Sequence, residues 1–121
     1  MKTLDPLTAA REAIAATNAR PATAVLFDAP DVRLVVFRLE PGQSVAPHRS
    51  ASTVMLTVLA GEGLLSGAND ERHCVAGDFV VYAPSETHGM AAHDHQLFLL
   101  ATITPRPGER TAAIAPLRAA V

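Results

Sequence analysis

Apolar and polar residues along the chain follow two patterns, one short and helical, the other long and extended. Near the N-terminus, apolar residues recur at the three- to four-residue period of a helix, at Leu7, Ala10, Ile14 and Ala15. Asp5 suits an N-cap position, and Pro6 suits the first turn that follows it. The pattern predicts a short, weakly apolar helix that continues until Asn18 and leans on the rest of the domain or on a second subunit.

From residue 22 to residue 104 the pattern becomes that of β-strands. Short runs rich in β-branched and aliphatic residues alternate with stretches of Gly, Pro, Asn and Asp; examples of the runs are TAVLFD, DVRLVVFRLE, TVMLTVLA and QLFLLATIT. This even spacing is typical of an antiparallel sandwich or barrel. The sequence therefore predicts an all-β protein, with residues 1–20 as a helical arm, 21–105 as a barrel and 106–121 as a C-terminal tail.

Alternation along one predicted strand identifies its inner face. Because successive side chains of a strand point to opposite sides, every second residue from position 48 shares one side. That side carries His48, Ser50, Ser52, Val54, Leu56 and Val58. It changes from polar to aliphatic, as expected for a strand that lines a cavity with a wet mouth and an apolar floor. We expect His48 to face the mouth.

Length, charge and cysteine content narrow the class of protein. The chain has 121 residues, a single cysteine and a net charge of -2, which suits one domain without an intrachain disulfide and without a basic surface for nucleic acid or membrane lipid. No apolar run reaches the length of a membrane span, and the first residues lack the apolar core of a secretory signal. We therefore expect a cytoplasmic protein with no nucleic-acid or membrane partner.

Two motifs of glycine, proline and histidine resemble those of the cupin superfamily of small β-barrels. The matching residues are Gly42, His48 and Gly61 in the first motif and Gly77, Pro84 and His88 in the second. The resemblance is close over residues 42–92 and looser over residues 22–104. It implies an antiparallel cupin-type β-barrel of the RmlC-like kind, which is a double-stranded β-helix or jelly roll, with the short helix added at the N-terminus.

Most metal ligands of that family are missing from this chain. Ser50 stands where metal-binding cupins carry a second histidine, and Val54 stands where they carry a glutamate. Only His48 and His88 carry over, and two imidazoles fall short of the three firm donors that Zn²⁺ or Fe²⁺ requires. We expect a degenerate site without a tightly held metal. The alternative is a divalent cation such as Zn, Fe, Mn or Ni held by the two histidines and water.

The two histidines reach one expected cavity from separate motifs. This favours a ligand site over the alternative that both are hydrogen-bonded at the cavity mouth without a functional role. The candidate ligand-binding residues form its expected polar rim and apolar wall and are His48, Ser50, Val54, Tyr82, His88 and Met90. Three other histidines are expected in solvated loops, at His73, His93 and His95. Cys74 occupies an apolar strand position and is expected in the core.

Three functions fit these features. The first is a small single-domain cupin that binds an unknown small organic ligand without metal chemistry. The alternative is a cupin enzyme, either metal-dependent and dioxygenase-like through His48 and His88, or a metal-free isomerase or epimerase with a histidine base and Tyr82 as acid; no residue is assigned a catalytic role. A scaffold function is compatible with both, and we expect a homodimer that buries the outer residues Met55 and Leu59.

Overall fold

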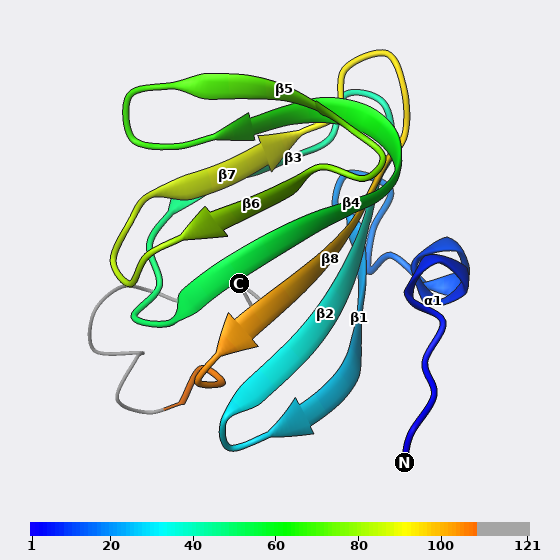
Figure 1. Ribbon diagram of the computed structural model, residues 1–121. Helices are drawn as coiled ribbons and strands as arrows, with labels where there is room; N and C mark the ends of the chain where they lie inside the picture. The colour runs from blue at the N-terminus through cyan, green and yellow to red at the C-terminus, as the bar shows by residue number, and fades with distance from the viewer. Residues whose placement is uncertain (109–121) are drawn as a thin grey trace.

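The computed structural model describes residues 1–108, which form a curled antiparallel sheet and one short helix (Figure 1). The elements in chain order are α1 (Pro6–Glu12), β1 (Ala22–Ala29), β2 (Val32–Leu39), β3 (Ser44–His48), β4 (Thr53–Ser66), β5 (Glu71–Val75), β6 (Phe79–Tyr82), β7 (His88–Ala91) and β8 (Leu97–Thr104). The prediction of an all-β antiparallel fold with a short N-terminal helix is confirmed. Of the predicted tail, residues 109–121 lie outside the described residues.

Strand β4 is long enough to belong to both layers of the barrel. The strand order is β1-β2-β8-β4-β7-β3, with β5 and β6 also paired with β4. Residues 53–61 of β4 pair with β8, and residues 62–66 pair with β5. Gly61 lies at the bend between the two parts with φ of +79°, and a Cβ at this position would overlap the carbonyl oxygen of Gln96. Glycine is therefore required where β4 turns from one layer into the other.

The inner face of the barrel is a packed aliphatic core. Along β4, Val54, Leu56 and Val58 are each at most 1% exposed, as the alternation predicts. Ser50 and Ser52 are also only 1% exposed, so the wet mouth expected around these two serines is not observed. The reason is local, because the Ser50 hydroxyl accepts a hydrogen bond from the Ser52 amide and the Ser52 hydroxyl donates to a carbonyl oxygen. Each serine thus has a partner inside the protein.

Helix α1 begins as predicted but ends six residues earlier. The Asp5 carboxylate accepts a hydrogen bond from the amide of Thr8, as expected of an N-cap. The helix ends at Glu12 rather than continuing to Asn18, and Ile14 is 88% exposed. The guanidinium of Arg38 donates to three carbonyl oxygens at this end of the helix, those of Ala10, Arg11 and Ala13. This contact with β2 satisfies carbonyls that a longer helix would have bonded itself.

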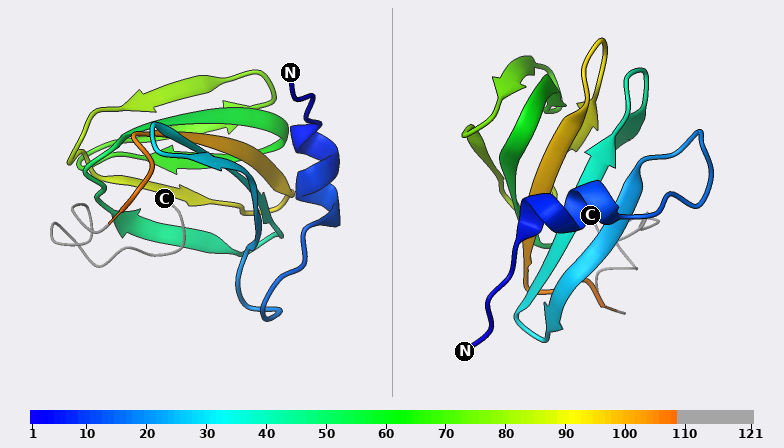
Figure 2. Two further views of the ribbon diagram at one scale, coloured as in Figure 1. Left: turned by 90° about the horizontal axis from the view of Figure 1, so that it is seen from below. Right: turned by 90° about the vertical axis from the view of Figure 1, so that its right-hand side faces the viewer.

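The helix covers the outer face of the layer formed by β1, β2 and β8 (Figure 2). Ala10 is fully buried there against Val36 and Phe98, and Leu59 packs against the same cluster. The helix thus packs against the barrel of its own chain, which is one of the two surfaces predicted to support it. Cys74 is 1% exposed in the core, as expected. Among residues 1–108, no helix is both long and apolar enough to cross a membrane.

Candidate functional site

His48 and His88 meet where β3 ends and β7 begins. They are cross-strand partners in the antiparallel pairing of these strands. Their ring centroids are 4.3 Å apart, with the ring planes inclined by 56°. His48 is half-buried, and its Nδ1 lies 2.9 Å from the carbonyl oxygen of Ala46. His88 is 1% exposed, so it lies deeper than a residue at a cavity mouth.

Two loops hold this pair of histidines together. The amide of Ser85, before β7, donates a 2.7 Å hydrogen bond to the carbonyl oxygen of Ser50, after β3. The Glu86 carboxylate accepts a 2.8 Å hydrogen bond from the Ala83 amide and so closes the bend between β6 and β7. Glu86 contacts His88 through its backbone carbonyl oxygen, which lies 3.4 Å from Nδ1. The loop backbone therefore orients the imidazole of His88, while the carboxylate of Glu86 shapes the loop.

Tyr82 is the third ring of the site. It is 5% exposed at the end of β6, and its ring centroid lies 5.1 Å from that of His88. Its hydroxyl donates a 3.0 Å hydrogen bond to the carbonyl oxygen of Ser66. Burial, with a smaller effect of the carboxylates of Glu86 and Asp70, raises the pKa of Tyr82 to about 12. The phenol is thus protonated at neutral pH, and its proton is directed to a backbone carbonyl.

Burial also controls the charge of His88. Removal from water disfavours the imidazolium and, with a smaller contribution from His48, lowers the pKa of His88 from 6.5 to about 4. The carbonyl and carboxylate of Glu86 act in the opposite direction but do not compensate. The Nε2 atom of His88 is buried and has no hydrogen-bond partner. An unsatisfied buried polar atom of this kind costs about 1–3 kcal/mol and requires an explanation in a native fold.

Of the other three candidate residues, Val54 and Met90 surround the rings with apolar atoms, and Ser50 adds a hydroxyl. Val54 is 1% exposed and is the cross-strand partner of Tyr82. Met90 is 2% exposed and belongs to the same core cluster. The Ser50 hydroxyl already accepts from the backbone of its own loop. Val54 and Met90 therefore supply apolar surroundings, and the polar chemistry of the site rests on His48, Tyr82 and His88.

The donor set does not fit a resident metal ion. Val54 has no donor atom, and the hydroxyl of Ser50 is a neutral oxygen that already accepts a hydrogen bond. Within residues 1–108, no group of three or more His, Cys, Asp or Glu side chains is arranged to hold a metal ion. Two imidazoles alone leave a transition metal one firm ligand short of the usual protein site.

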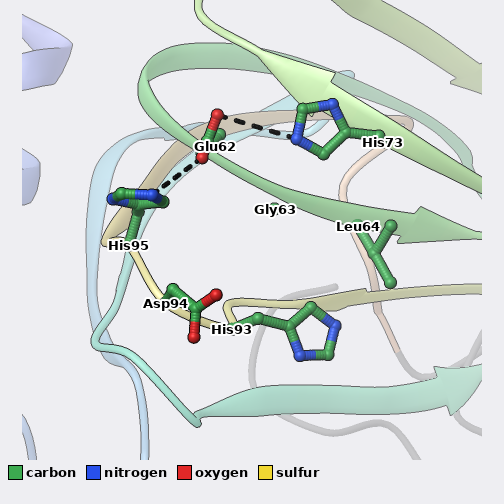
Figure 3. A pocket seen from close by; sticks show the side chains of 7 residues that line it. All are labelled: Glu62, Gly63, Leu64, His73, His93, Asp94 and His95. Atoms are coloured by element: carbon green, nitrogen blue, oxygen red, sulfur yellow. Dashed lines mark ion pairs between the residues drawn. The ribbon is translucent and has the colours of Figure 1, made fainter.

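A separate pocket of about 190 Å³ lies beside the bend of β4 (Figure 3). The carboxylate of Glu62 lies there between two imidazoles, 3.0 Å from Nε2 of His95 and 3.7 Å from Nε2 of His73. Both histidine side chains are more than half exposed, as predicted, but His73 lies in strand β5 and not in the loop that the sequence predicted. The sequence analysis missed the cluster because its members come from β4, β5 and the loop before β8. The only local signal was the closely spaced pair of His93 and His95 in the turn before β8.

Fold and sequence together identify the class of protein. Residues 35–103, more than half of the chain, match the family model described as a cupin domain, so the chain belongs to the cupin family. No curated protein matches the chain.

Solved structures give the same fold. A RmlC-like cupin protein from Desulfovibrio desulfuricans superposes with a TM-score of 0.72 at 26% identity, over 87% of this chain and 97% of that one. An uncharacterized conserved protein with a double-stranded β-helix domain from Klebsiella pneumoniae has a TM-score of 0.72 and 25% identity, over 79% and 86%. The DMSP lyase DddQ from Ruegeria pomeroyi has a TM-score of 0.67 at 18% identity, over 82% of this chain and 53% of its own, which shows the fold alone.

Proposed function

We propose that this cupin binds a small organic ligand at the pair of His48 and His88, without a tightly held metal. The observation that carries the proposal is the buried Nε2 of His88, which lacks a partner in a site that also contains a second imidazole and a phenol. A fold that only needed to fill this volume would place an apolar side chain there at lower cost. A ligand that bonds to Nε2 accounts for the histidine.

The surroundings of the pair suit entry of a small molecule. His48 is half-buried, and its chain neighbour Arg49 is exposed, as is Ser85 in the facing loop. The site therefore lies directly beneath the surface between these two loops. The apolar side chains of Val54 and Met90 supply the contact area, and a few polar atoms supply direction, which is the usual composition of a small-molecule site.

A screen of neutral fragments by NMR on protein with labelled histidines tests the proposal. Fragments that bind should shift the ring signals of His48 and His88, and His48→Ala should weaken their binding. His73→Ala, at an exposed position on β5 outside the pair, is the matched control and should bind as the wild type does. Near-stoichiometric Zn, Fe, Mn or Ni in chelator-washed protein would contradict the metal-free assignment.

The same geometry is less suited to acid–base catalysis. A histidine whose pKa is about 4 is a weak base at neutral pH, and the hydroxyl proton of Tyr82 is already donated to the carbonyl of Ser66. An isomerase or epimerase would need an unpartnered acid and a stronger base in these positions. We therefore favour binding over catalysis as the function of these residues.

We also propose that the protein forms a homodimer, with an interface that differs from the one expected from the sequence. Leu59 is covered by α1 of its own chain. The apolar surface lies instead on β6, where Phe79 is 57% and Val81 is 54% exposed beside Met55, the cross-strand partner of Val81. Because β6 pairs with no strand of residues 1–108 other than β4, a second copy of this strand can pack against it about a two-fold axis. Light scattering at micromolar concentration should show a dimer, and Phe79→Asp should yield a monomer; a monomeric wild type would contradict the proposal.

A further inference from the structure

The polar side chains of the site each direct their proton to a backbone carbonyl. Nδ1 of His48 faces the carbonyl oxygen of Ala46 at 2.9 Å, and Nδ1 of His88 faces that of Glu86 at 3.4 Å. The hydroxyl of Tyr82 donates to the carbonyl of Ser66 at 3.0 Å. A carbonyl oxygen can only accept, so a neutral imidazole in such a contact carries its proton on Nδ1.

The tautomer at Nδ1 determines what the rest of each ring offers. When Nδ1 carries the proton of a neutral imidazole, Nε2 carries a lone pair and acts as an acceptor. In His88 this acceptor is the buried atom without a partner. The oxygen of Tyr82 likewise retains acceptor capacity after donating its only proton. His88 and Tyr82 therefore present electron pairs, and no hydrogen-bond donor, to a bound molecule.

We propose that the ligand presents a neutral hydrogen-bond donor, such as a hydroxyl or amide group, to Nε2 of His88, and that carboxylate and phosphate groups are rejected at this point. The inference rests on the proposed function and adds the chemical class of the ligand. A carboxylate would place its own lone pairs against those of the imidazole in a dry site, with no proton between them. An uncompensated charge in such surroundings is far more costly than in water.

The tautomers can be tested without any ligand. Long-range proton–nitrogen correlation spectra of histidine-labelled protein near pH 7 report which ring nitrogen is protonated, and His88→Phe assigns the signals by their loss. We expect the Nδ1-protonated form for His88, with an unprotonated Nε2. A ring protonated on Nε2, or on both nitrogens, would overturn the inference whatever ligand is later found.

Matched probes test the recognition itself. Acetamide and acetate have nearly the same shape, as do isobutyramide and isobutyrate, and only the amides can donate a hydrogen bond. We expect each amide to bind at least about tenfold more tightly than its carboxylate, because a direct hydrogen bond to a buried acceptor contributes about 1.4 kcal/mol or more. His88→Phe should abolish this preference, and His73→Ala should retain it.

The outcomes separate this inference from the proposed function. Equal affinity for amide and carboxylate, or a preference that survives in His88→Phe, would overturn the donor-group inference while leaving a ligand site in place. Failure of the amides and of the fragment screen to perturb either histidine would overturn the proposed function. The tautomer measurement would then decide the electrostatic part of the inference by itself.

Discussion

Acidification should destabilise this protein before its carboxylates titrate, because His88 resists protonation only while the protein is folded. The pKa of His88 is about 4 in the folded protein and 6.5 for an ordinary histidine. Above pH 6.5 the ring is neutral in both states and has no effect on stability. Between pH 6.5 and pH 4 the unfolded chain binds a proton that the folded protein does not, so the free energy of unfolding falls with falling pH and levels off below pH 4.

The size of this loss of stability follows from the pKa of His88 in the folded protein and its ordinary pKa. Each pH unit between them contributes about 1.4 kcal/mol, so the whole interval corresponds to about 3 kcal/mol. The ring is almost fully buried, which is why little discount for solvent screening is needed. The lowered pKa values of Asp5, bonded to Thr8, and Asp28, bonded to Arg33, act below pH 3.8 and fall outside this window.

Urea denaturation followed by circular dichroism at several pH values between 7 and 4 measures this effect. His88→Asn keeps a side-chain amide that can bond to the carbonyl of Glu86 but does not titrate. We expect wild-type protein to lose about 3 kcal/mol more than this variant between pH 7 and pH 4, whatever their difference at pH 7. His73→Asn, at an exposed position, is the control and should follow the wild type. Equal pH slopes for the wild type and His88→Asn would refute the reasoning.

Substitutions at four further positions test the fold by urea denaturation. Gly61→Ala should cost more than about 3 kcal/mol, because a left-handed backbone and a clash with the carbonyl of Gln96 act together, whereas Gly77→Ala has φ of +95° but open space and should cost about 1 kcal/mol. Arg38→Ala should cost about 2 kcal/mol or more by freeing three carbonyls of the helix end, while Arg38→Lys recovers part of this loss; a cost below 0.5 kcal/mol, on the order of a surface change, would contradict the capping role. Glu62→Gln should cost less than about 1 kcal/mol because its histidine contacts are exposed, and a larger loss would show that the contacts hold the β4 bend.

The strands could be predicted from the sequence because each is a short apolar run between turn residues, and these signals are local. The end of α1 could not, since it depends on Arg38, which reaches the helix from a strand more than twenty residues away. Burial of Ser50 and Ser52 was missed for a similar reason. The Ser50 hydroxyl bonds to the amide of Ser52, and the Ser52 hydroxyl bonds to the carbonyl of Pro105. Both partners are backbone groups, so the pattern of side chains does not predict either bond.

The candidate site could likewise be predicted only in part. Two spaced motifs were sufficient to bring His48 and His88 to one place, because both lie on strands whose register the turns fix. The protonation and hydrogen-bonding state of the rings could not be read in this way. It depends on the carbonyls of Ala46, Glu86 and Ser66, and every residue type carries such a carbonyl. The backbone conformation of the loops, and not the identity of their side chains, thus determines which ring atoms face a carbonyl.

The side chain at position 54 bears on the charge state of the histidines. A carboxylate at this buried position, next to Tyr82, would favour the imidazolium and raise the pKa of a nearby histidine. A valine carries no such charge, and burial lowers the pKa of His88 to about 4. A neutral imidazole with a lone pair on Nε2 follows from both effects. Under the proposed function, a valine at this position therefore suits His88 to accept a hydrogen bond from an organic ligand.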